Sequence, residues 1–286
     1  MKETLRAATF LDKGGTGKTT VAAHLGVACA RQGHEVLLID LAGKQGDLAK
    51  HFGLWEEYQN RIAADEAWPN VATVFRDQWD AIADKLGDDA VENLILRTDE
   101  RVDIVPAHPN LDGLDTELAN IDDTEDRYSR LSRFLDEYVD PLRYDIVLID
   151  LPGLTNNVSY NGLWAAGNVI APVEPGAFEA QQAARLDADM AQIREQFVSD
   201  MSLTMVVPNK VDTRTVLADE YLDTFAETYP AAMAPAYVPA SQDIRNAAER
   251  GHSAFRLKSP SQTAEKARSA FVQNAKELVE RLKEGE

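Results

Sequence analysis

The sequence predicts an α/β fold, with one doubly wound domain whose mostly parallel central sheet is flanked by helices. Short apolar runs recur along the chain without polar alternation, as is typical of strands buried on both faces of a parallel sheet. Stretches with helical periodicity, such as 21–32 and 177–197, separate these runs. A hydrophobic content of 44% in 286 residues is enough for a sizeable core. Alternating strands and helices are the pattern of α/β folds.

The predicted elements follow one another without a linker or an internal repeat, so residues 1–286 are expected to form a single domain. The predicted strands cover residues 7–11, 35–41, 102–107, 144–151, 168–173, 203–210 and 235–240. Residues 55–100 are irregular, and we expect helices and loops over one edge of the sheet.

The C-terminal segment, 241–286, is predicted to be helical and packed on the domain. Its apolar residues at helical spacing are Phe271, Val272, Ala275, Leu278, Val279 and Leu282. A membrane anchor is the alternative, but this helix has no aromatic-basic face and ends in acidic residues.

Composition points to the cytoplasm. The net charge is −19, from 48 acidic and 29 basic residues. Avoidance of nucleic acid is one explanation; we favour adaptation to high salt, where acidic excess keeps a protein dissolved and self-repulsion is screened. The single cysteine, Cys29, is expected to be a buried helix residue, which fits a reducing compartment. We see no signal peptide and no apolar run of the roughly 18 residues that a membrane helix needs.

The stretch "DKGGTGKTT", residues 12–20, carries the predicted nucleotide site. It follows the strand at 7–11 and precedes a helix that begins at Lys18, the context in which glycines let backbone N–H groups surround a phosphate. Lys18 would reach the β- and γ-phosphates, and the Thr19 hydroxyl would bind Mg²⁺. The expected cofactors are therefore ATP and Mg²⁺. The predicted phosphate-binding residues are Gly14, Gly15, Thr16, Gly17, Lys18, Thr19 and Thr20.

The loop departs from the general pattern, because Asp12 occupies the place of the first glycine and Lys13 precedes the others. The resulting K-G-G-x-G-K-T resembles the deviant phosphate loop of the ParA/MinD family of dimerising ATPases. The resemblance implies a homodimer formed on ATP binding, in which Lys13 contacts the partner's nucleotide as a lysine counterpart of the arginine finger. The alternative is a loop lysine exposed to water.

The resemblance covers nearly the whole chain. "YDIVLIDLPGL" resembles the family's Walker B strand, which makes Asp150 the carboxylate on the Mg²⁺ side, acting through water. "VPASQDIRNAAERGHSAF" resembles a segment near the ParA C-terminus, and with the lack of a membrane helix it favours ParA over MinD. The nitrogenase iron protein is excluded because its cysteine ligands are missing.

ParA-like function is what the resemblance implies. It would be plasmid or chromosome partition, with non-specific duplex DNA and a ParB-like activating protein as partners, and with the protein on the nucleoid. The alternative is a MinD-like positioning or regulatory switch that does not use DNA. No stable membrane insertion is expected.

The first switch of the family usually reads D-x-D-P-Q-G, and its second aspartate orients the attacking water. Counted from Lys18, that aspartate falls on Ala42, whose methyl group can neither accept a proton nor hold a water. Such groups typically contribute 10²- to 10⁴-fold to a rate. We therefore expect tight ATP binding and slow hydrolysis, with Asp40 and Asp47 as the candidates to compensate.

The stretch "PNKVD", residues 208–212, leaves the choice of base open. Asn-Lys-x-Asp after an apolar strand is how many GTPases recognise guanine, through the aspartate. In ParA-like proteins the same strand end contacts adenine, and Asn209 matches that position. We favour ATP over GTP and assign Asn209 and Asp212 to the nucleotide site.

Basic residues gather near the C-terminus of this acidic chain. Residues 241–283 contain nine basic and five acidic residues, a local charge of +4. ParA dimers bind duplex DNA through this region, and a dimer doubles the number of phosphate contacts. A solvated helix face is the alternative. The candidate DNA-binding residues are Arg245, Arg250, Arg256, Lys258, Lys266 and Arg268.

Overall fold

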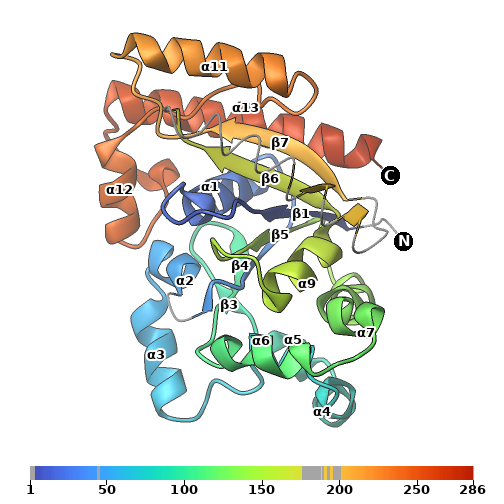
Figure 1. Ribbon diagram of the computed structural model, residues 1–286. Coiled ribbons are helices and arrows are strands. Elements are labelled where there is room, and N and C mark those ends of the chain that lie inside the picture. The colour runs from blue at the N-terminus through green and yellow to red at the C-terminus, as the bar shows by residue number, and fades with distance from the viewer. Residues whose placement is uncertain are drawn as a thin grey trace.

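The computed structural model describes residues 4–43, 46–175 and 201–285, together with positions 188, 190, 191, 194 and 195. Its centre is a seven-stranded sheet in the order β3-β4-β2-β5-β1-β6-β7 (Figure 1). The strands are β1 (Leu5–Thr9), β2 (Val36–Asp40), β3 (Leu96–Arg97), β4 (Val102–Val105), β5 (Ile146–Asp150), β6 (Asn168–Val173) and β7 (Ser202–Pro208). All neighbours pair in parallel except β3 and β4. The predicted α/β fold is confirmed.

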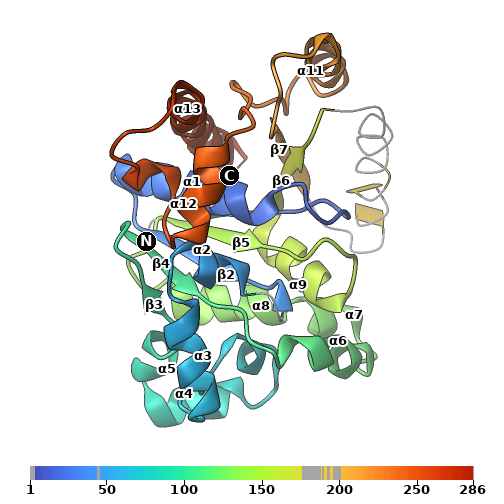
Figure 2. The same ribbon diagram turned by 90° about the vertical axis from the view of Figure 1, so that its left-hand side faces the viewer.

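Helices cover both faces of the sheet. Helices α1 (Lys18–Arg31) and α13 (Gln262–Glu284) pack together on one face, and α9 (Asn157–Ala166) lies on the other (Figure 2). Side chains of a strand alternate between the faces. In β2, accordingly, Val36 and Leu38 join the core under α1 and α13, whereas Leu37 and Ile39 join the core under α9.

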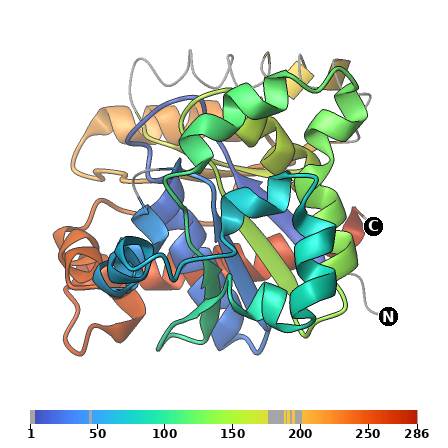
Figure 3. The same ribbon diagram turned by 90° about the horizontal axis from the view of Figure 1, so that it is seen from below.

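The remaining elements surround these layers. They are α2 (Asp47–His51), α3 (Trp55–Ala63), η2 (Val71–Phe75), α4 (Trp79–Leu86), α5 (Asp89–Glu92), α6 (Leu111–Ala119), α7 (Thr124–Tyr128), α8 (Arg130–Phe134), η3 (Leu135–Val139), α11 (Val216–Thr228), α12 (Gln242–Glu249) and η4 (Ala254–Arg256). Seen from below, the cyan and green helices between residues 79 and 139 lie across the sheet (Figure 3). Helices and loops over 55–100 were predicted, but the two-residue edge strand β3 was not.

The strand predicted over 235–240 is wrong. This segment contributes only an isolated bridge between Val211 and Pro239, although Val238 N donates to Pro208 O and Val211 N donates to Val238 O. Pro235 and Pro239 carry no N–H, so the segment cannot continue a ladder beside β7. The helix predicted over 177–197 lies almost wholly outside the described residues.

The predicted C-terminal helix is confirmed and docked on the domain. Phe271, Ala275 and Leu278 of α13 are fully buried, and the helix contacts α1, β1 and β7. Val272 was predicted to lie on the same apolar face, but it is 41% exposed and does not belong to the buried face. In the described part of the chain, no helix has the length and apolar character needed to cross a membrane.

Candidate functional site

The candidate site lies where the carboxyl ends of β1, β2 and β5 meet. Thr9 and Asp40 both lie level with Asp150, because they pair with it in the two flanking strands. The loop of residues 10–17 connects β1 to α1 above this edge. Crevices at the carboxyl ends of parallel strands, beside a helix N-terminus, are the usual place for phosphate ligands in such folds.

Two glycines of the loop take left-handed conformations that other residues rarely adopt. Gly15 has φ of +84° and Gly17, directly before α1, has φ of +91°. A Cβ on Gly17 would lie 2.4 Å from Asn209 Nδ2. Space beside Gly14 and Gly15 is open, since a Cβ on either would meet nothing within 4 Å.

Replacing Gly17 with alanine is expected to disrupt the loop. The Gly17→Ala variant would place a methyl group in the Asn209 side chain and in a left-handed backbone, at a cost of about 1–3 kcal/mol. Urea unfolding measures this loss. Gly14→Ala is the matched control, because Gly14 has neither a positive φ nor a close neighbour. Equal unfolding midpoints for the two variants would contradict the loop geometry.

Lys18 folds back beneath the loop. It is buried, and its Nζ donates to Lys13 O at 2.7 Å and to Leu11 O at 3.2 Å. Burial lowers the pKa of Lys18, and the charge of Asp150 opposes this shift. Gly153 makes room for the arrangement, because a Cβ there would lie 2.7 Å from Lys13 O and 2.9 Å from Lys18 Nζ. Sequence analysis missed Gly153, three residues after Asp150.

Asp150 is held by two hydroxyl groups. The Thr19 hydroxyl donates to Oδ2 at 2.6 Å and the Thr9 hydroxyl donates to Oδ1 at 2.9 Å. Burial raises the pKa of Asp150 to about 6, against the opposing effect of the two hydroxyls. A hydroxyl and a carboxylate at this distance are the hard oxygen donors that Mg²⁺ prefers, so the residues present fit the ion. Nearby, Thr16 Oγ1 is buried with no hydrogen-bond partner among the described residues, as a group awaiting a ligand would be.

The Asp40 carboxylate accepts hydrogen bonds from backbone N–H groups of the first switch and of α2. The side chain is fully buried, and it accepts from Ala42 N at 2.9 Å and from Leu48 N at 3.1 Å. Burial raises the pKa of Asp40 to about 8, and the nearby Asp150 charge adds to the rise. Asp47 is partly exposed and pairs with Lys50 at 3.4 Å. Of the two candidates to replace the missing aspartate, Asp47 alone is open to solvent.

Lys13 and Asp12 lie at the start of the loop and are open to solvent to different degrees. Lys13 is partly exposed, and Asp12 is exposed and accepts from the Thr155 hydroxyl at 3.2 Å. The placement of Lys13 is compatible with contact to a second subunit. That contact stays a prediction.

The "PNKVD" segment meets the phosphate loop through two side chains. Asn209 is buried and its Nδ2 donates to Thr16 O at 2.9 Å, while Lys210 donates to Gly15 O and pairs with Glu174. Asp212 pairs with Arg214 at 2.6 Å, and the hydrogen bonds from Arg214 lower the pKa of Asp212 to about 2. Lys210 is a contact that sequence analysis missed, although it lies inside the quoted motif.

A buried histidine ties the phosphate-loop helix to the C-terminal segment. Ala254 N donates to His24 Nε2 at 3.0 Å, so Nδ1 carries the proton and donates to Thr20 O at 2.8 Å. Burial lowers the pKa of His24 to about 4, which keeps the ring neutral. His51 lies against it at 5.1 Å between ring centroids, and burial lowers its pKa as well.

His24 should therefore make stability depend on pH. The pKa of His24 in the folded protein, about 4, is below the ordinary histidine value of 6.5, so the unfolded chain binds more protons between these pH values. Stability should fall as pH falls from 6.5 to 4, by about 3 kcal/mol from this group. His24→Gln should lose that component. Urea unfolding of both proteins at pH 4.5 and 7.5 tests it, and an identical pH dependence would contradict the assignment.

The six predicted DNA-binding residues fall into three groups. Arg245, Arg250, Lys258 and Lys266 are exposed and form no ion pair with a described residue. Arg256 is exposed and pairs with Asp99 at 3.2 Å.

The guanidinium group of Arg268 forms hydrogen bonds within the fold. The Arg268 side chain is 16% exposed, its Nε donates to Ala254 O at 2.7 Å, and it also bonds Leu257 O and Glu265. The guanidinium therefore holds the segment around η4 to α13, and we no longer count Arg268 as a DNA contact.

Comparison with known proteins finds a matching family model and similar partition ATPases. Residues 7–203 match a family model described as an AAA domain. The chain is 30% identical over 210 residues to the chromosome-partitioning ATPase Soj of Treponema pallidum, covering 73% of this chain and 72% of the relative. It is 25% identical over 239 residues to the sporulation initiation inhibitor protein Soj of Bacillus subtilis, covering 84% and 85%.

Solved structures share the fold. Cobyrinic acid a,c-diamide synthase from Mycobacterium smegmatis, with bound ATP analogue and magnesium, is 26% identical with a TM-score of 0.73, covering 99% of this chain and 98% of that one. The septum site-determining protein MinD of Pyrococcus horikoshii, complexed with Mg-ADP, is 22% identical with a TM-score of 0.65, covering 96% of each chain.

Proposed function

The chain belongs to the ParA/MinD family of partition ATPases, and we propose that it is an ATP-dependent dimerising switch for plasmid or chromosome partition. In this proposal the ATP-bound dimer binds duplex DNA without sequence preference. Slow hydrolysis, accelerated by a ParB-like partner, releases it. The observation that carries the proposal is the phosphate loop over Asp150, with a second, partly exposed lysine at the start of that loop.

ATP and Mg²⁺ are the proposed cofactors. Mg²⁺ would neutralise charge on the β- and γ-phosphates, and Thr19 with Asp150 would hold it. Lys18 would exchange its present backbone acceptors, Leu11 O and Lys13 O, for phosphate oxygens. Relatives solved with an ATP analogue and magnesium support this assignment.

ATP is proposed over GTP. Asn209 lies against the phosphate loop, where its Nδ2 donates to Thr16 O at 2.9 Å, and in ParA-like proteins this position contacts adenine. Thermal unfolding with each nucleotide distinguishes the two, since a ligand stabilises the state it binds. Greater protection by GTP than by ATP would reverse the assignment.

DNA binding is the proposed output because exposed basic residues gather on α12, on α13 and on the segment between them. Four of them, Arg245, Arg250, Lys258 and Lys266, form no ion pair with a described carboxylate. A dimer would present two such surfaces, so affinity for DNA can follow the state of the nucleotide. The MinD-like positioning switch remains the alternative, favoured by the acidic bulk charge and by Ala42.

Light scattering tests the switch directly. With ATP and Mg²⁺ the mass should double relative to ADP, and Lys13→Ala should stay monomeric under both conditions. The matched control is Lys85→Ala, which removes an exposed lysine on α4, outside the phosphate loop and the segment that contacts it. A monomer with ATP, or an unchanged dimer in Lys13→Ala, would overturn the dimer proposal.

A further inference from the structure

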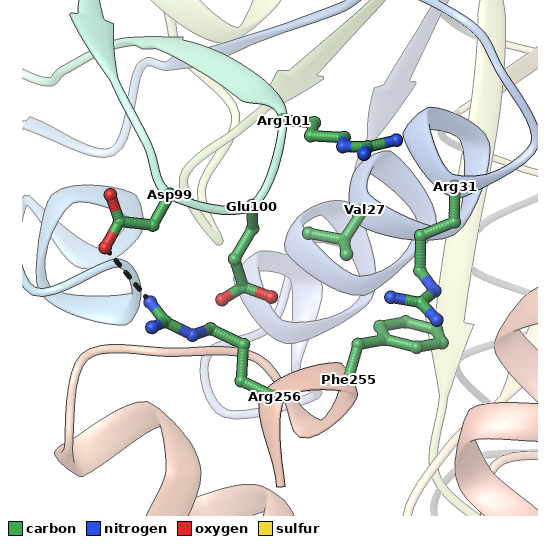
Figure 4. A pocket seen from close by; sticks show the side chains of 7 residues that line it. All are labelled: Val27, Arg31, Asp99, Glu100, Arg101, Phe255 and Arg256. Carbon is green, nitrogen blue, oxygen red and sulfur yellow. Dashed lines mark hydrogen bonds and ion pairs between the residues drawn. The ribbon is translucent and has the colours of Figure 1, made fainter.

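A cavity of about 360 Å³ lies away from the nucleotide site, where three segments distant in sequence meet (Figure 4). The second half of α1 contributes Val27 and Arg31, the turn between β3 and β4 contributes residues 99–101, and the segment at η4 contributes Phe255 and Arg256. Lys18 begins α1 and Arg31 ends it, which places them about 20 Å apart at 1.5 Å per residue. The turn precedes β4, so it lies at the opposite edge of the sheet from the phosphate loop.

Two of the three arginines in the cavity are not neutralised. Arg256 pairs with Asp99 on one side of the cavity, while Arg31 and Arg101 lie on the other (Figure 4). Glu100 is buried and engaged, because its carboxylate accepts from Ser253 N at 2.7 Å and from the Ser253 hydroxyl.

Among the described residues, the two remaining guanidinium groups have no acidic partner. Arg31 lies over the Phe255 ring at 5.3 Å, and neither Arg31 nor Arg101 pairs with a described carboxylate. In a chain of net charge −19, two such arginines at one cavity are a local positive site.

Arg101 occupies a position that suits glycine. Its φ is +63°, in the left-handed region, which is unfavourable for a residue with a side chain. It ends a tight antiparallel turn, where glycine or asparagine is usual. An arginine held there at this cost points to a use for its guanidinium group.

We propose that this cavity binds a small phosphomonoester of nucleoside-monophosphate size, with the phosphate between Arg31 and Arg101. Guanidinium groups bind phosphate through paired N–H donors, and two of them match its double negative charge. The volume is within the range of small-molecule sites. A DNA backbone fits less well, because each phosphodiester carries one charge and a duplex meets protruding side chains rather than a hollow.

Calorimetric titration tests the site with the nucleotide site filled by Mg-ADP. The probes are inorganic phosphate, ribose 5-phosphate and AMP, with a short random-sequence duplex as a separate arm. AMP should bind most tightly and inorganic phosphate least. Repeating the AMP titration with Lys18→Ala and no ADP should give the same affinity, so the outcome does not depend on the proposed ATPase function.

Two variants locate the binding. Arg101→Gly and Arg31→Ala should each weaken AMP binding about tenfold or more, from the loss of charged hydrogen bonds. Arg101→Gly should keep or raise the melting temperature, since glycine suits that backbone. Arg250→Ala, an exposed arginine outside the cavity, is the matched control and should bind AMP normally.

Three results would overturn the proposal. They are no AMP binding beside Mg-ADP, equal AMP affinity in Arg101→Gly, or an effect of Arg101→Gly on duplex binding alone. The last result would make the cavity part of a DNA surface.

Discussion

Ala42→Asp is expected to raise the rate of ATP hydrolysis by about 10²- to 10⁴-fold, the usual contribution of a group that positions or deprotonates the attacking water. Ala42 lies two residues beyond the end of β2, where its N–H already bonds Asp40, so the backbone is fixed and a longer side chain would extend from a defined position. Single-turnover hydrolysis with excess protein measures the chemical step alone. Nucleotide affinity should change far less than the rate.

Asp47→Ala is the control variant. It shows whether the native protein lacks a water-positioning carboxylate or uses Asp47 in its place. If Asp47 compensates in the native chain, Asp47→Ala should abolish the residual hydrolysis, since Asp47 is partly exposed at the start of α2. Asp40 is a poorer candidate, because both of its oxygens accept backbone N–H groups. A native rate equal to that of Ala42→Asp, with Asp47→Ala unaffected, would contradict our account of the first switch.

Lys18→Ala is expected to weaken nucleotide binding by at least about 10²-fold, because it would remove the proposed charged contact to the β- and γ-phosphates. The same change also leaves the acceptors Leu11 O and Lys13 O without their ammonium partner. Equilibrium titration with a fluorescent ATP analogue measures the affinity.

Lys13→Ala is the matched control for this prediction. It makes the same substitution in the same loop, but Lys13 is proposed to act on the partner's nucleotide. Binding to the monomer should therefore remain within a few-fold of native while dimerisation is lost. Equal losses of affinity in the two variants would assign Lys13 to its own subunit's nucleotide instead.

Much of the fold could be predicted because the central strands are buried on both faces. Runs such as residues 36–40 and 146–150 are apolar throughout, and the structure places them in the middle of the sheet. The edges were harder. Strand β3 has only two residues, too few for any periodicity, and residues 235–240 have strand-like composition but prolines that block a ladder.

The parts of the candidate site that belong to a short sequence motif could be predicted, because the motif specifies both the residue types and the spacing between them. The loop from Gly14 to Thr20 and the carboxylate of Asp150 are of this kind, and the structure brings Thr19 and Asp150 within 2.6 Å. Contacts between distant segments were not. Gly153 against Lys18, and His24 against Ala254, depend on how the helices pack, which the spacing of residues within one segment does not encode.

Charge along the sequence was a partial guide to the surface. It identified the exposed Arg250 and Lys258 but also Arg268, whose guanidinium is used within the fold. It missed Arg31 and Arg101, because they come from segments that are not basic overall. Only the folded chain brings these two arginines to one cavity.

The most direct test of the central claim is binding to random-sequence duplex DNA in molar KCl, with ATP, with ADP and without nucleotide. Native protein should bind only with ATP, and Lys13→Ala should not bind under any of the three conditions. Lower salt should strengthen binding in every case where it occurs, because phosphate contacts release counterions. DNA binding that ignores the nucleotide, or ATP-dependent dimers that do not bind DNA, would contradict the partition switch.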